Sequence, residues 1–115
     1  MTIGQAVAIV AILAQVYGTP QLPCMIHAES DYRVTATNGD HKGAAQYRHP
    51  EQGESIWDLL AGMAVRDSAF LHRDYVLAHW TPEDLISAVT VMGWAIRNGY
   101  GEWWSTWTMC GGEGK

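Results

Sequence analysis

The sequence contains few of the basic residues on which nucleic-acid binding depends. It has seven Lys and Arg residues against twelve Asp and Glu residues, which gives a formal net charge of −5. Because binding to phosphates is driven by clustered Lys and Arg, this balance argues against a nucleic-acid partner. The sequence also lacks internal repeats and low-complexity linkers. Its 115 residues, of which 48% are hydrophobic, suit a single domain, residues 1–115, whose core needs no metal.

No hydrophobic run in the sequence has the length of a membrane-spanning helix. The longest candidate, residues 3–17, is apolar and rich in Ala, but a spanning helix needs about 20 residues. It also lacks the basic flank of a signal peptide. We expect a buried first helix that ends at Gly18, and no stable membrane insertion. The alternative is a signal-anchor that is later released into the periplasm.

Cysteine is scarce, since Cys24 and Cys110 are the only two. They allow at most one internal disulfide. If paired, they would tie the C-terminal tail to the second predicted helix and stabilise the fold by about 4 kcal/mol in the chain-entropy model. Two free thiols are an equally good interpretation, because two cysteines do not reveal the redox compartment.

The sequence lacks the common motifs of metal and serine-nucleophile sites. The five histidines form no His-Glu-x-x-His motif, and the cysteines have no zinc-binding spacing. We therefore expect no metal and no other cofactor, with a zinc site of Asp40, His41 and His49 as a minor alternative. No Gly-x-Ser-x-Gly segment surrounds Ser30, which argues against a nucleophilic serine there.

One carboxylate, Glu29, stands where a soluble helix normally carries an apolar side chain. In residues 22–30, read as a helix, Leu22, Met25, Ile26 and Glu29 are spaced as i, i+3, i+4 and i+7 and share one face. Apolar surroundings penalise the charged form of a carboxyl, and a general acid must carry its proton near neutral pH. Glu29 is therefore our candidate catalytic residue. The alternative is a structural carboxylate paired with a basic neighbour or a backbone donor.

The residues around Glu29 predict a helix, a hairpin and a tight turn. Thr19 as N-cap, followed by Pro20, predicts a second helix that ends at about Ser30. Asn38-Gly39 is typical of a two-residue hairpin turn, with residues 33–35 as the first strand. Residues 43–46, Gly-Ala-Ala-Gln, are small enough for the backbone to approach a ligand closely, and they end in an amide.

The second half of the chain predicts further helices. Ser55 and Asp58 have the spacing of a capping box, and helical spacing continues to Ala78 as one long helix or two. Thr81, followed by Pro82, predicts the start of a core helix that ends at residues 97–99. From Gly101 onward we expect a loop rich in Trp, with residues 111–115 frayed.

These residues resemble a known family. Pro20-Gln21-Leu22, His27-Ala28-Glu29-Ser30, Asn38-Gly39 and Gly43-Ala44-Ala45-Gln46 are similar to the Pro…Glu-Ser…Gly-Leu-Met/Trp-Gln pattern of lytic transglycosylases and related lysozyme-like domains. The segment Trp103-Trp104-Ser105-Thr106-Trp107 resembles the Trp-Ser-x-Trp ending of short phage and actinobacterial members, including those near resuscitation-promoting factors. The chain departs from the pattern at Ala44 and Ala45, which replace larger apolar residues. Residues 92–100 match the family's Ala-Tyr-Asn-Ala-Gly block poorly.

The resemblance implies a mainly α (α+β) fold, a lysozyme-like helical domain with a small β-hairpin beside the active-site cleft. It implies cleavage of the β-1,4 bond between N-acetylmuramic acid and N-acetylglucosamine in peptidoglycan glycan strands. Glu29 would be the general acid and base. A hydrolase usually needs a second carboxylate, for which Asp40 is the best candidate, whereas a lytic transglycosylase needs Glu29 alone. The lack of an obvious partner favours the transglycosylase.

Candidate substrate-binding residues accompany Glu29. Ser30 orients Glu29 or bonds the end of its helix, and Gln46 offers its amide. Flat rings with a polar edge stack on sugars, and the candidates are Tyr47, Tyr100, Trp103 and Trp104. We expect Tyr47 and one of the two tryptophans to line the cleft. Three basic residues of the hairpin region are further candidates for an anionic glycan: Arg33, Lys42 and Arg48.

The chain carries no appended wall-binding module, which favours a phage-encoded, virion-associated lysin or endolysin. Its expected location is the phage virion or the bacterial cell envelope and periplasm. The alternative is a catalytically silent glycan-binding or virion structural protein with the same fold. The sequence does not predict an oligomeric state.

Overall fold

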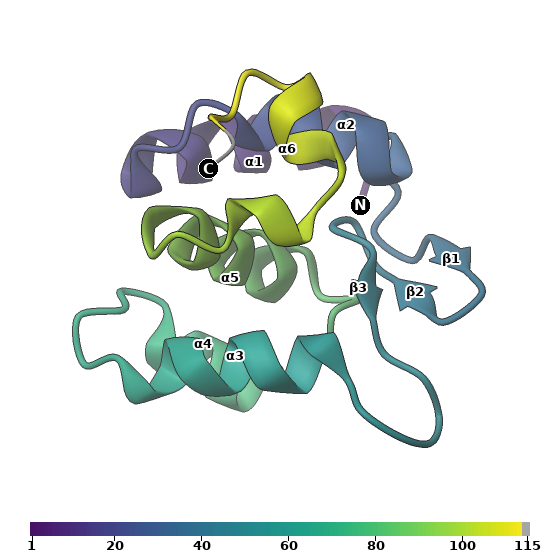
Figure 1. Ribbon diagram of the computed structural model, residues 1–115. Helices are drawn as coiled ribbons and strands as arrows, with labels where there is room; N and C mark the ends of the chain where they lie inside the picture. Colours follow the sequence, from purple (N-terminus) through teal and green to yellow (C-terminus); the bar gives the residue numbers. More distant parts are fainter. Residues whose placement is uncertain (114–115) are drawn as a thin grey trace.

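The computed structural model of the protein describes residues 1–113 and is mainly helical (Figure 1). The six α-helices and one small antiparallel sheet of the described chain confirm the predicted mainly α (α+β) class. The helices are α1 (Ile3–Tyr17), α2 (Leu22–Ser30), α3 (Ile56–Arg66), α4 (Arg73–Ala78), α5 (Leu85–Arg97) and α6 (Thr106–Met109), with a 3₁₀ helix η1 (Gly101–Trp103). The strands are β1 (Thr37–Asn38), β2 (His41–Lys42) and β3 (Tyr47–Arg48).

Helix α5 is the core of the molecule. Residues 87–95 are all buried, so this helix is covered around its whole circumference, as its almost uninterrupted run of apolar and small residues predicts. It contacts α1, α2, α3, α4 and η1. Figure 1 shows α5 between a layer of α1 and α2 and a layer of α3 and α4, with the three strands at one side.

The predicted first helix is confirmed, together with its end at Gly18, which takes a left-handed conformation (φ +60°). It is buried on one face only. That face consists of Ala6, Val10, Leu13, Ala14 and Tyr17. Four larger apolar side chains on the remaining surface of the helix are exposed: Ile3, Val7, Ile12 and Val16. The expectation of a buried helix therefore holds for this one face only, because α1 packs on the rest of the molecule from one side.

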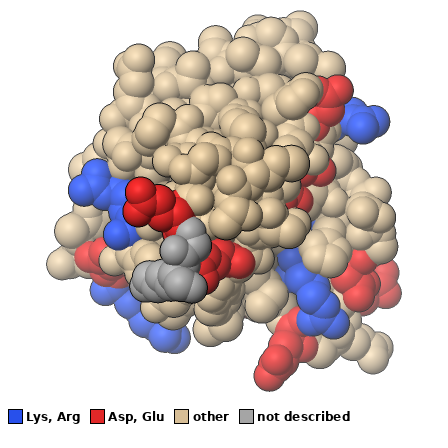
Figure 2. Space-filling view, turned by 45° about the horizontal axis from the view of Figure 1, so that its top comes forward, with Lys and Arg blue, Asp and Glu red and all other residues tan. Residues whose placement is uncertain are grey.

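The first 28 residues contain no Asp, Glu, Lys or Arg. Figure 2 shows a broad uncharged area over its upper part, while charged side chains are spread over its lower half and its right side. No helix within residues 1–113 is long and apolar enough to cross a membrane.

The second helix begins at Leu22, three residues after the predicted N-cap. Thr19 is used by the preceding helix instead, since its amide donates to the carbonyl of Ala14 and closes the end of α1. Gln21 stands at the N-cap, and Pro23 lies in the first turn, where a missing N–H costs nothing. The end of the helix at Ser30 is as predicted.

The hairpin is confirmed, but its first strand was predicted too early, and its loop lies one residue later than the predicted Asn38-Gly39 turn. Strands β1 and β2 pair with Asn38 opposite His41, which leaves Gly39 and Asp40 as the two-residue loop. Residues 33–35 form turns, because backbone amides in this segment bond to nearby carbonyls and not to a partner strand. The third strand, β3, pairs with β2 and was not predicted, since two residues are too short to show alternation.

In the second half, Ser55 is the N-cap of α3 as predicted and accepts from the amide of Asp58. The helical pattern up to residue 78 divides into two helices, α3 and α4. The core helix α5 begins at Leu85, so Thr81 is not its N-cap. The carboxylate of Asp84 accepts from the amide of Ser87 at that place, while Thr81 caps a turn before the helix.

The C-terminal segment is not the predicted loop, since it contains η1 and α6. Cys24 and Cys110 form a disulfide with a Cα–Cα distance of 5.6 Å, which decides between the two interpretations of the cysteines. Within the segment predicted to fray, the carbonyl of Glu113 accepts from the indole of Trp107, and the fraying itself stays a prediction. The remainder of that segment, residues 114–115, lies outside the described residues.

Residues 43–46 do allow a close approach, but of the chain's own backbone. Gly43 has φ +80°, and a Cβ on it would stand 1.8 Å from the carbonyl oxygen of Pro82. Ala44 and Ala45 are fully buried. The small residues therefore let this turn pack against the segment that leads into α5, which corrects the expectation that they face a ligand.

Removing the disulfide by Cys24→Ser with Cys110→Ser is expected to lower the free energy of unfolding by about 4 kcal/mol, because the bond closes a loop of 86 residues. Urea denaturation measures the loss. Wild type in reductant is the matched control and should reach the same stability as the double variant. Unchanged stability of the reduced wild type would contradict the expectation.

Gly43→Ala is expected to cost about 3 kcal/mol, since it adds a clash with the Pro82 carbonyl to the left-handed strain. Gly39→Ala is the matched control, because Gly39 also has positive φ (+61°) but open space around it. Strain alone should cost about 1 kcal/mol there. Equal losses for the two variants in urea denaturation would contradict this account.

Candidate active site

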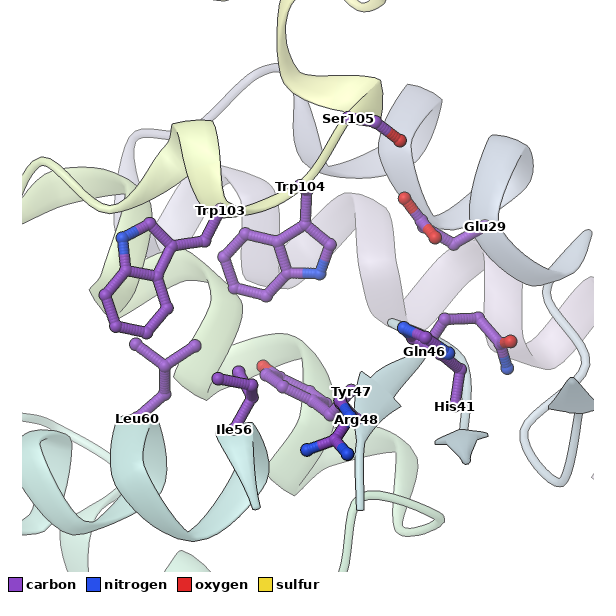
Figure 3. A pocket seen from close by; sticks show the side chains of 10 residues that line it. All are labelled: Glu29, His41, Gln46, Tyr47, Arg48, Ile56, Leu60, Trp103, Trp104 and Ser105. Atoms are coloured by element: carbon purple, nitrogen blue, oxygen red, sulfur yellow. The ribbon is translucent and has the colours of Figure 1, made fainter. Parts of the chain in front are cut away.

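Glu29 and two of the motif tryptophans line one hollow of about 210 Å³ (Figure 3). The hollow lies where the end of α2, the strands β2 and β3, the start of α3 and the segment from η1 to α6 meet. Its lining residues are Glu29, His41, Gln46, Tyr47, Arg48, Ile56, Leu60, Trp103, Trp104 and Ser105. Residues far apart in the sequence, including both halves of the family motif, therefore form one site.

Glu29 lies in the last turn of α2, half-buried, with its carboxylate turned into the hollow (Figure 3). The predicted stripe is confirmed, since Leu22, Met25 and Ile26 are fully buried beside it. The hydroxyl of Thr106 donates to Oε2 of Glu29 over 2.7 Å. This contact was not predicted, because it joins residues 77 positions apart.

No ion pair within residues 1–113 involves Glu29, and its basic neighbours are engaged elsewhere. His27 pairs with Asp31, with 2.8 Å between Nδ1 and Oδ1. Arg33 donates from Nε to the carbonyl of Ser30. The expected alternative, a structural carboxylate held by a basic neighbour, is therefore not what the structure has; a neutral hydroxyl is its partner.

Asp40 is not brought into this hollow. It is exposed in the hairpin loop and lines a separate depression with Lys42, Glu51 and other residues. Its carbonyl accepts from the amide of His49, next to the pairing of β2 with β3. Glu29 is consequently the only carboxylate among the ten residues that line the hollow.

Gln46 lines the hollow as predicted and has a left-handed backbone (φ +53°), which is uncommon for a residue with a side chain. Its amide Nε2 donates to the carbonyls of Ala36 and Gly43, at 3.1 and 2.9 Å. These two bonds fix the amide and assign its nitrogen. Its oxygen is left as the group that can accept a bond from a ligand.

The aromatic residues of the hollow differ in what they offer a ligand. Trp103 is 47% exposed, whereas Trp104 is 7% and Tyr47 1% exposed. Trp104 donates from Nε1 to the carbonyl of Ala45, and the Tyr47 hydroxyl donates to that of Ala88. Burial raises the pKa of Tyr47 well above its ordinary value, so this phenol stays neutral. Trp103 therefore offers the ring face, and the other two are buried walls.

Two predicted binding residues do not line the hollow. Ser30 is buried, and its hydroxyl donates to the carbonyl of Ile26 at 3.2 Å, so it bonds its own helix and does not touch Glu29. Tyr100 lies behind Trp103, edge to face at 5.3 Å between ring centroids, and supports that ring. Its role is one of packing.

Sequence reasoning missed several residues of the hollow. They are His41, Ile56, Leu60 and Ser105. Arg48, which stands opposite His41 on β3, was already a candidate. Of the three basic residues considered for an anionic glycan, only Arg48 lines this hollow. Knowing how β2 pairs with β3 would have placed His41 beside Arg48. A strand of two residues, such as β3, shows no alternation from which that pairing could be predicted. Within residues 1–113 no three His, Cys, Asp or Glu side chains are placed to hold a metal, and the zinc alternative is not supported.

A second hollow, of about 390 Å³, lies between α1, α5 and the α3–α4 connection, but its polar groups are used by the fold. Both oxygens of Asp67 accept bonds, from the Trp94 indole at 2.8 Å and from the Ala69 amide at 2.9 Å. These bonds, that of Trp94 first, lower the pKa of Asp67 and favour its charged form. Arg97 donates to the carbonyl of Tyr17. Glu29 therefore marks the better candidate for an acid.

A comparison of the chain with protein-family models, curated proteins and solved structures found no match in any of the three. These comparisons assign the chain to no family. The relation to lysozyme-like domains stays a prediction from the sequence motifs, and a fold alone does not imply an activity.

Proposed function

We propose that the protein is a glycosidase that cleaves the β-1,4 bond between N-acetylmuramic acid and N-acetylglucosamine in peptidoglycan. Glu29 is its general acid and base. The observation that carries the proposal is the position of Glu29 as the lone carboxylate of a hollow that also presents the exposed indole of Trp103. The glycan substrate comes from the family resemblance.

In the proposed reaction Glu29 donates its proton to the glycosidic oxygen as the bond to C1 of the muramic acid breaks. The resulting carboxylate then takes the proton from the 6-hydroxyl of the same sugar. That oxygen attacks C1 and closes a 1,6-anhydro ring. The proton lost in the first step is regained in the second, so neither a second carboxylate nor an added water is needed.

The lining of the hollow favours this transglycosylase over a hydrolase. Both hydrolytic mechanisms place a second carboxyl group beside the scissile bond. Asp40, the candidate for that role, lines a different depression. We therefore assign Asp40 a role in the hairpin turn and none in catalysis.

The proposed partner is a glycan strand of the bacterial wall. The protein would reach it from a phage virion or within the cell envelope.

A glycan-binding or virion structural protein without catalysis is the second candidate. The hydrogen bond from Thr106 to Glu29 favours it, since a purely structural carboxylate would also be held in this way. The two candidates differ in whether products form and in whether Glu29 is needed for them.

Glu29→Gln is expected to abolish muropeptide release from purified peptidoglycan, with a loss of at least about 10²-fold, because the amide cannot supply the proton. Mass spectrometry of wild-type products should find fragments about 18 Da lighter than hydrolytic ones, since the anhydro ring lacks one water. Asp40→Asn is the matched control and should retain activity. If wild type instead forms products with ordinary reducing ends, and Asp40→Asn does not, the protein is a hydrolase. If wild type releases no muropeptides from several wall types, only the binding role remains.

Trp103→Ala is expected to raise KM for glycan strands about tenfold, because the exposed ring face is lost, while kcat changes little. Trp103→Phe should keep most of the affinity. Trp80→Ala, which removes an indole that is exposed outside the hollow, serves as the control. A Trp103→Ala protein with the wild-type KM would exclude this ring from substrate binding.

A further inference from the structure

The partner of Glu29 comes from the last helix of the chain. Thr106 is 8% exposed, and its hydroxyl lies 2.7 Å from Oε2 of Glu29. Within residues 1–113 no other hydrogen bond to this carboxylate is made. Thr106 belongs to α6 and does not itself line the hollow.

A threonine hydroxyl has one proton to donate, and here it is directed to one of the two carboxylate oxygens. That oxygen, Oε2, is thereby engaged, and Oε1 is left for a ligand in the hollow that Glu29 lines. We propose that Thr106 is a positioning residue, which selects Oε1 of Glu29 as the oxygen that exchanges the proton. This inference rests on the proposed function, since it gives Glu29 its orientation for that reaction.

The neutral character of the partner suits an acid that must also act as a base. A Lys or Arg beside Glu29 would favour the charged carboxylate throughout the reaction. A hydroxyl donates to the carboxylate and can turn to accept from the protonated carboxyl, so it serves Glu29 in both states. The absence of ion pairs to Glu29 in the described chain agrees with this need.

The disulfide holds Thr106 in place. Helix α6 has four residues, too few to be stable alone, with Thr106 at its start and Cys110 directly after its end. Cys110 is bonded to Cys24 in the first turn of α2, and Glu29 lies near the other end of α2. The two helices are therefore joined at two points, one covalent and one through the hydrogen bond at the site.

The bond is tested first by a double-mutant cycle on unfolding in urea, which needs no activity. The proteins are wild type, Thr106→Val, Glu29→Ala and the double variant. We expect a coupling of about tenfold in the unfolding equilibrium constant, because each single substitution removes the same hydrogen bond. Additive effects of the two substitutions would overturn the inference.

The positioning role is tested by muropeptide release. Thr106→Val, which keeps the shape of the side chain, should lower kcat about tenfold and move the alkaline limb of the pH profile upward, because the charged carboxylate has lost a donor. Thr106→Ser should restore both. Thr108→Val, on the exposed side of the same helix, is the control and should behave as wild type. Wild-type kcat and an unmoved limb in Thr106→Val would overturn the role.

The dependence on the disulfide is tested by combining Thr106→Val with Cys24→Ser and Cys110→Ser. The kcat of this triple variant is compared with that of Thr106→Val and that of the Cys24→Ser, Cys110→Ser variant, under conditions where all three are folded. If the disulfide affects activity through Thr106, the triple variant should have a kcat no lower than the lower of the other two. Multiplied losses would overturn this link. An inactive wild type would overturn the proposed function, and with it the catalytic role, whereas a wild type active through Glu29 but indifferent to Thr106→Val would overturn the positioning role alone.

Discussion

The burial of α5 on all sides is the constraint on which the rest of the structure depends. Each wall of the hollow is attached to it. The Tyr47 hydroxyl donates to the carbonyl of Ala88 and so fixes β3. The turn at Gly43 packs on Pro82 in the approach to α5, and η1 begins four residues after the helix ends. Helix α2, which carries Glu29, contacts it directly. The positions of the residues that line the hollow therefore depend on their contacts with this one buried helix.

Glu29 makes no ion pair within residues 1–113, although Arg48 lines the same hollow. The chain has no charged residue before Glu29, and its nearest polar partner is a hydroxyl. A carboxylate without a cationic partner keeps access to both protonation states, which acid and base catalysis requires. A carboxylate with a purely structural ion-pair role would need a cationic partner to offset its desolvation, and Glu29 has none within residues 1–113.

The hollow combines groups that the fold has already satisfied with a few that remain open. The donors of Tyr47, Trp104 and Gln46 all bond to backbone carbonyls, so these side chains are walls of fixed geometry. The open groups are an oxygen of Glu29, the amide oxygen of Gln46 and the ring face of Trp103. Such an arrangement holds a ligand without rebuilding its own hydrogen bonds, which reduces the cost of binding.

Local patterns in the sequence determined the helical class, the first helix with its end at Gly18, the hairpin turn and the choice of Glu29. These features follow from residues within about one or two helical turns of each other, where spacing and backbone preference act directly. The starts of α2 and α5 were misplaced because Thr19 and Thr81 carry the signal of an N-cap but are used by an adjacent turn. Side-chain chemistry alone does not reveal such competition.

Only the tertiary structure decided which residues share the site. It paired Cys24 with Cys110, brought Thr106 to Glu29, removed Asp40 from the hollow and buried Tyr47 while leaving Trp103 open. Each of these outcomes depends on packing between segments that are dozens of residues apart. A sequence pattern specifies residue types and their spacing along the chain. Contacts between distant segments depend instead on how those segments pack around the buried helix α5.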